Sequence, residues 1–194
     1  MTNKGQARRE EIVEQTISVV AESGIADLSF EAISKATGLT KPHIQYYFKS
    51  KEVLLLDCFQ HIATVAQQIT QKHVESKHTW QGRLLAVAEA AFIWIDRHPQ
   101  HAAVLFLYYH YCTLNPQLSK VHQEVRAVGR ERIEEILKAG LPENKKSQIA
   151  QLAFNIQTYL TGVVMEMASA QSFHDESFRK QACNHIDHLL EMVA

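Results

Sequence analysis

Residues 30–52 read FEAISKATGLTKPHIQYYFKSKE, and this stretch predicts two short helices joined by a tight turn. Gly38 tolerates the left-handed backbone with which the first of these helices ends. Thr40 is expected to open the second helix and to cap its free N–H groups with the side-chain hydroxyl. Ile44 and Phe48 are four residues apart, so both face the interior from that second helix. The stretch therefore predicts a helix-turn-helix whose second helix lies in the major groove of DNA.

The other side chains of that second helix point outward and have the chemistry of DNA readers. Lysine and glutamine can hydrogen-bond to base edges, proline and histidine can touch the bases, and tyrosine hydroxyls can reach phosphates. The predicted DNA-binding residues are Ser29, Lys41, Pro42, His43, Gln45, Tyr46, Tyr47 and Lys51.

The net charge of the chain is −1, so no overall positive field indicates a nucleic-acid partner. The distribution of cations is more informative. Six of them are placed where phosphates are expected, at the ends of the first helix and around the second helix of the pair. These are Lys4, Arg8, Arg9, Lys41, Lys49 and Lys51.

Together with the helix before it, from about Arg8, the stretch resembles the N-terminal domain of the tetracycline-repressor (TetR) family of transcription regulators. Gln45 departs from the family pattern, because it stands where the family usually has a phosphate-binding tyrosine. The resemblance implies a DNA-binding regulator, usually a repressor, whose last two helices pair with those of a second subunit. The segments that stand at the positions of the family pattern are Ile33-Ser34, Thr37-Gly38-Leu39, Ile44-Gln45-Tyr46-Tyr47-Phe48 and Ser50-Lys51-Glu52.

The composition predicts a compact, helix-rich protein, since 46% of the 194 residues are hydrophobic and only seven are Gly and four Pro. No stretch alternates with a period of two, so the fold class is all-α. A DNA-binding domain is expected over residues 1–50 and a helical ligand-binding and dimerisation domain over 51–194. Turn residues give about nine helices. Besides the two short helices of the quoted stretch, they are expected near 7–23, 50–73, 79–97, 99–113, 116–139, 143–170 and 175–192.

Two apolar stripes run along the last two of these helices, and both must be covered. By resemblance, a second subunit covers them in a four-helix bundle. The alternative is that both stripes pack within their own subunit. The predicted dimer-interface residues are Ile156, Leu160, Val164, Met167, Phe178, Ala182, Ile186 and Leu189.

The middle of the chain has more apolar and aromatic residues than single stripes require, which predicts a cavity for a small molecule. Ordinary close packing of a core is the rival interpretation. The residues predicted to line the cavity are Phe59, Ile62, Phe92, Trp94, Leu107, Tyr108, Tyr111, Phe154, Thr158 and Thr161.

The spacing of histidines, cysteines and carboxylates along the sequence does not indicate a metal site or a catalytic site. His98 and His101 are three residues apart, and His185 and His188 repeat this spacing, but neither pair has a cysteine or carboxylate at a matching distance. A glycine-rich phosphate loop and a GxSxG motif are also absent from the sequence. We therefore expect no metal, no cofactor and no enzymatic activity.

Three widely separated cysteines, Cys58, Cys112 and Cys183, indicate reduced thiols and a cytoplasmic protein. No apolar run approaches the ~20 residues that cross a bilayer, so no membrane role is expected.

The predicted function is transcription regulation. A homodimer would repress from a palindromic double-stranded DNA operator, and an unknown small hydrophobic or aromatic effector would release it. The alternative is a constitutive DNA-binding protein whose body serves protein–protein interaction.

Overall fold

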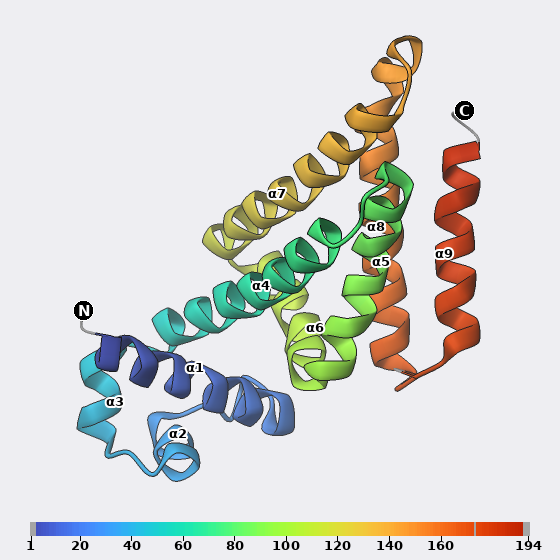
Figure 1. Cartoon of the computed structure of the whole chain (residues 1–194). Helices are drawn as coiled ribbons and strands as arrows, with labels where there is room; N and C mark the ends of the chain where they lie inside the picture. Colours follow the sequence, from blue (N-terminus) through green and yellow to red (C-terminus); the bar gives the residue numbers. More distant parts are fainter. Residues whose placement is uncertain (1–2, 173, 192–194) are drawn as a thin grey trace. The chain divides into compact units, whose positions relative to one another are not determined.

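The computed structural model describes residues 3–172 and 174–191, which form nine α-helices, one short 3-10 helix and no strand (Figure 1). The all-α fold predicted from the sequence is confirmed. The helices are α1 (Asn3–Ser23), α2 (Phe30–Thr37), α3 (Lys41–Tyr47), α4 (Lys51–Glu75), α5 (Trp80–Arg97), α6 (Pro99–Leu114), α7 (Pro116–Gly140), η1 (Glu143–Gln148), α8 (Ile149–Ser169) and α9 (Glu176–Glu191).

The helix boundaries follow from residues at the termini. Gly38 has φ +70° and ends α2, and its N–H donates to the carbonyl of Ser34. Ser29 caps the start of α2, because its hydroxyl accepts a hydrogen bond from the N–H of Ala32 at 3.1 Å. Thr40 corrects one expectation: it holds the N-cap position of α3, but its side chain makes no capping hydrogen bond there.

Residues 143–148 correct a second expectation, because they form the 3-10 helix η1 and not the first turns of a long α-helix. The segment reads ENKKSQ, and none of its residues is buried. With no apolar side chain to pack against a neighbour, the segment gains little from α-helical geometry. The α-helix α8 begins at Ile149, the first buried residue after the segment.

The chain forms two compact units. Unit 1 comprises the chain up to Thr64 together with Gln100–Leu118, and unit 2 comprises Val65–Pro99 together with the chain from Ser119 onward. This division differs from the boundary expected at residue 50, since the first half of α4 and most of α6 belong with the helix-turn-helix.

Hydrogen bonds explain why α4 and α6 group with α1. The Cys58 thiol in α4 donates to the carbonyl of Val13 in α1, with 3.8 Å between sulfur and oxygen. The Ser18 hydroxyl in α1 donates to Oε1 of Gln100 in α6 at 2.8 Å. Between α4 and α6, the rings of Phe59 and Tyr108 lie 4.2 Å apart.

The core of unit 1 is built from fully buried side chains of its first four helices. The guanidinium of Arg9 covers the ring of Phe48 at 4.9 Å and also pairs with the carboxylate of Asp57. These contacts fix the end of α3 between α1 and α4. The fully buried aliphatic residues here include Ile12, Ile17, Ile33, Ile44 and Leu54.

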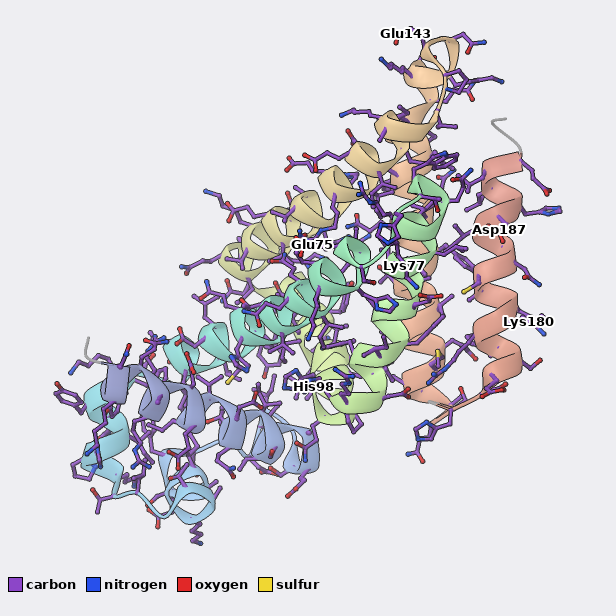
Figure 2. All side chains as sticks on the ribbon, in the orientation of Figure 1. Glu75, Lys77, His98, Glu143, Lys180 and Asp187 are labelled. Atoms are coloured by element: carbon purple, nitrogen blue, oxygen red, sulfur yellow. The ribbon has the colours of Figure 1, made fainter. Side chains whose placement is uncertain are left out.

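In unit 2, α5, α8 and α9 pack on one another. Arg179 of α9 binds Oδ1 of Asp96 at 2.6 Å and lies 5.5 Å from the centre of the Phe92 ring, so it joins α9 to α5. The outer surface of α9 is charged, as Lys180 and Asp187 show (Figure 2). No helix in the described part of the chain is long and apolar enough to span a membrane.

Candidate nucleic-acid interface

Helix α3 separates its buried and exposed side chains as the sequence predicts. Ile44 and Phe48 are completely buried and hold the helix against unit 1. Tyr47 is half-buried at the edge of the exposed surface. The remaining predicted DNA-binding residues of this helix are all exposed, namely Lys41, Pro42, His43, Gln45 and Tyr46.

The aromatic side chains of α3 support one another. The rings of His43 and Tyr47 are stacked 5.8 Å apart with 30° between their planes, and Tyr46 meets Tyr47 edge-on at 5.2 Å. Tyr46 is 74% exposed, so its hydroxyl is free to reach a neighbouring molecule. These ring contacts restrict the motion of the side chains that carry the hydroxyl and imidazole groups. Such groups suit contacts to phosphates and base edges.

The two lysines predicted to contact DNA have different partners. Lys41 lies 3.4 Å from a carboxylate oxygen of Glu31, and both side chains are largely exposed. Such a surface pair contributes little to stability, so Lys41 can exchange Glu31 for a phosphate or base at little cost. Lys51 donates to the carbonyl of Leu28 at 3.0 Å, which braces the loop before α2.

Four further cations were expected near phosphates. Within the described part of the structure, two of them form ion pairs and two do not. Arg8 pairs with Glu11 at 2.7 Å, and Arg9 is held by Asp57 and Phe48. Arg9 therefore serves packing within unit 1, whereas Arg8 makes a partly exposed ion pair within α1. Lys4 and Lys49 are exposed, and neither takes part in an ion pair among the described residues. Ser29, the remaining predicted contact, uses its hydroxyl to cap α2.

Unit 1 also contains a cavity of about 420 Å³. It lies between the loop that joins α1 to α2, the first turns of α4, and the end of α6 with the start of α7. Phe59 and Tyr111, two of the residues predicted to line a ligand site, are among its lining residues, and Lys51 and Glu52 add charged groups. The sequence did not single out its other apolar lining residues: Ile25, Ala26, Leu28, Val53, Leu55, Leu56 and Leu118.

The other predicted cavity residues lie elsewhere. In unit 1, Ile62 is buried, Leu107 is half-buried, and the Tyr108 hydroxyl donates to the carbonyl of Leu118 at 3.4 Å. Burial raises the pKa of that Tyr108 hydroxyl, so it stays protonated. None of these three residues is among those that line the 420 Å³ cavity.

In unit 2, the predicted cavity residues are split between the interior and the surface. Phe92 and Trp94 are buried, and the Trp94 Nε1 has no hydrogen-bond partner among the described residues. Phe154 is 46% exposed and Thr158 is exposed as well, so these two residues do not line an interior cavity of the chain. Thr161 accepts a hydrogen bond from Nη1 of Arg126 at 2.7 Å.

The residues predicted for the dimer interface lie mostly inside unit 2. Their apolar stripes cover each other and α5, so packing within the subunit already removes them from water. Phe178 and Leu189 are half-buried. The six others are buried: Ile156, Leu160, Val164, Met167, Ala182 and Ile186.

A helix-turn-helix with an outward-facing second helix, joined to a helical body, defines the class of DNA-binding transcription regulators. Residues 12–58 match the family described as bacterial regulatory proteins, tetR family, and residues 80–191 match the family described as BetI-type transcriptional repressor, C-terminal. The chain belongs to the TetR family of transcription regulators, and its C-terminal part is of the BetI type.

Individual proteins agree with this assignment. The chain is 23% identical over 150 residues to the HTH-type transcriptional regulator BetI of Vibrio campbellii, a match that covers 75% of this chain and 74% of that protein. A TetR transcription regulator from Haloarcula marismortui has the same fold, with a TM-score of 0.81 at 15% identity over 97% of this chain and 98% of that one. A TetR-family regulator from Cytophaga hutchinsonii gives a TM-score of 0.79 at 17% identity over 100% and 98% of the two chains.

Proposed function

We propose that this protein is a repressor that binds a palindromic operator as a two-fold dimer and leaves it when a small hydrophobic or aromatic molecule binds. The observation that carries the proposal is the exposed surface of α3. Its polar and aromatic side chains, Lys41, His43, Gln45 and Tyr46, have no role in the core of unit 1. Their chemistry matches base edges and phosphates.

The cavity in unit 1 supports a ligand-responsive protein. Its volume of about 420 Å³ lies within the ~300–1,000 Å³ of small-molecule sites. Most of its lining is aliphatic or aromatic, which favours a hydrophobic guest. A guest there would touch Leu28 and Lys51, which are joined by a hydrogen bond at the loop before α2. It would therefore act directly on the loop that positions the helix-turn-helix.

Release from DNA requires that the guest prefer one arrangement of unit 1 over another. If the guest separates Lys51 from the carbonyl of Leu28, the loop before α2 loses its brace. The arrangement of unit 1 that holds the guest would then differ from the one that holds DNA. The two ligands would weaken each other's binding by the same factor.

A two-fold dimer would use the outward surface of α8. Phe154, Thr158 and Gly162 follow one another at intervals of four residues, and all three are exposed. Phe154 is an exposed aromatic residue that a partner would cover, and a Cβ added to Gly162 would meet no atom within 4 Å. This surface leaves room for close approach of a second copy of α8. The two heads would then read half-sites about one helical turn apart, ~34–36 Å, or a multiple of this distance.

The function is tested by selecting bound sequences from random DNA and then screening small molecules for release of the selected site. We expect a palindromic consensus and at least one hydrophobic or aromatic compound that lowers operator affinity. A selected site with no compound that affects it would favour the constitutive DNA-binding protein. Failure to select any sequence would contradict the assignment of α3 as the reading helix.

A further inference from the structure

Three metal-ligating side chains from three helices of unit 1 meet in one place. Nε2 of His61 in α4 lies 2.6 Å from Oε1 of Glu14 in α1. Nε2 of His101 in α6 lies 3.3 Å from the other oxygen, Oε2, of the same carboxylate. The two imidazole rings are 6.0 Å apart and meet edge to face. One ligand atom from each of the three residues lies within 4.8 Å of the others.

The donor set fits a divalent transition metal. Two imidazole nitrogens and one carboxylate oxygen are ligands that zinc accepts, with water in the remaining position. Bonds of about 2.0–2.1 Å in a tetrahedron give ligand atoms ~3.3 Å apart. The separation between His101 and Glu14 already has this value. His61 would lose its hydrogen bond to Glu14 and move outward by less than about 1 Å for the ion to enter.

The site offers one carboxylate and two imidazole rings. An entering cation would replace the hydrogen bonds that Nε2 of His61 and Nε2 of His101 share with the Glu14 carboxylate. The side chain of Glu14 is 46% exposed and that of His61 24% exposed, so an ion can reach the site from solvent.

Cys58 does not complete the donor set. It precedes His61 by three residues in α4, but its thiol points to the carbonyl of Val13. Burial raises the pKa of this thiol, which keeps it protonated and unsuited to binding a metal. A water molecule would therefore occupy the fourth coordination position of the metal ion.

A second histidine–carboxylate contact in the chain differs from the proposed metal site in its third group. Nε2 of His73 lies 2.7 Å from Glu89, but the third group at this carboxylate is the ammonium of Lys77, at 3.2 Å. Lys77 lies just after α4 (Figure 2). The positive charge of Lys77 already neutralises the Glu89 carboxylate and would repel a metal ion. The cluster of His73, Lys77 and Glu89 therefore serves as a matched control.

We propose that Glu14, His61 and His101 form a binding site for a divalent metal ion of the zinc class, which fastens α1 to α4 and α6. The site does not depend on the effector or on the operator. Local spacing could not reveal it, because Glu14 and His61 are 47 residues apart and Glu14 and His101 are 87 apart.

The test uses the full chain, stripped of metal with a chelator and titrated with Co²⁺ as a spectroscopic probe and with Zn²⁺ by calorimetry. We expect one ion per chain, visible absorption typical of four- or five-coordinate Co²⁺, and a rise in unfolding temperature with added Zn²⁺. Glu14→Gln and His61→Gln should each weaken binding by about tenfold or more, whereas His73→Gln should leave it unchanged.

Both variants change partly exposed side chains, so the fold should survive, and thermal unfolding checks this directly. A parent chain that takes up no Co²⁺ at micromolar concentration would overturn the proposal. Binding that persists unchanged in folded Glu14→Gln or His61→Gln would overturn it as well, because the ion would then sit on other histidines.

Discussion

At the scale of single residues, the exposed side chains of α3 and the half-buried carboxylate of Glu14 perform different tasks. Lys41 and Gln45 make no contact that the fold needs, apart from the weak surface pair of Lys41 with Glu31. Glu14 joins two histidines from other helices. Substitutions should therefore affect DNA recognition in the first case and stability in the second.

Lys41→Ala or Gln45→Ala should change the preference for particular bases. A lost bidentate contact costs ~1–3 kcal/mol at the affected base pair. Lys51→Ala should instead weaken all sequences similarly and flatten the salt dependence, if it holds a phosphate. Binding of a set of single-base operator variants by fluorescence anisotropy measures both effects.

Lys72→Ala serves as a control for these variants, because Lys72 is exposed on α4 in unit 2. It should leave both affinity and base preference unchanged. If Lys41→Ala and Gln45→Ala behave like Lys72→Ala, α3 does not read bases through these side chains.

Glu14→Gln should lower the free energy of unfolding of the metal-free protein at neutral pH. Partial burial would raise the pKa of Glu14, but hydrogen bonds from His61 and His101 and their charges lower it below the usual value of 4.5. The carboxylate therefore contributes stability above pH 4.5. That contribution is lost as the pH falls through the lowered pKa. Urea unfolding of parent and variant should therefore converge in acid, and a difference that grows toward low pH would contradict the assignment.

At the scale of elements, two glycines with positive φ set the ends of the first two helices. Gly24 has φ +80° and Gly38 has φ +70°. A Cβ added at Gly38 would meet no atom within 4 Å, so space does not require a glycine there. The positive φ of the backbone is what favours glycine. The short helices α2 and α3 depend on this turn, because neither is long enough to be stable by itself.

Gly38→Ala should destabilise the protein by ~1–2 kcal/mol, the cost of left-handed backbone for a residue with a Cβ. Gly38→Asn should cost less, since asparagine tolerates this conformation. The midpoint of urea unfolding measures both. Equal effects of the two substitutions would mean that backbone strain is not the cause.

At the scale of the whole molecule, assembly and ligand response depend on which surfaces the fold leaves open. The apolar face of α8 that includes Leu160 is buried within unit 2. Phe154, on the opposite face, is 46% exposed and available to a second chain. The cavity of unit 1 is bounded by segments from both ends of that unit's sequence.

Phe154→Asp should yield folded monomers, because it places a charge on the surface proposed for the dimer without disturbing the core. Leu160→Asp should instead unfold unit 2, since an unpaired charge would be buried. Analytical ultracentrifugation and circular dichroism separate the two results. A parent chain that is monomeric at micromolar concentration would remove the dimer from the proposal.

Leu55→Trp should fill the cavity of unit 1 and abolish release by an effector while DNA binding persists. Leu114→Trp is the control, because Leu114 is 67% exposed in α6 and does not line the cavity. Operator binding with and without an effector found by screening measures the response. If the effector still releases the Leu55→Trp variant fully from the operator, the effector binds outside this cavity.

The sequence by itself determined the α-helices apart from the start of α8, the helix-turn-helix, and the inward position of Ile44 and Phe48. Caps, turn glycines and helical periodicity are local signals, so they can be interpreted without knowing the neighbours. The tertiary structure decided that the apolar stripe of α8 packs within unit 2, where the cavity lies, and that Glu14, His61 and His101 meet. Periodicity shows which residues share a face, but the choice of neighbour depends on packing between helices far apart in sequence.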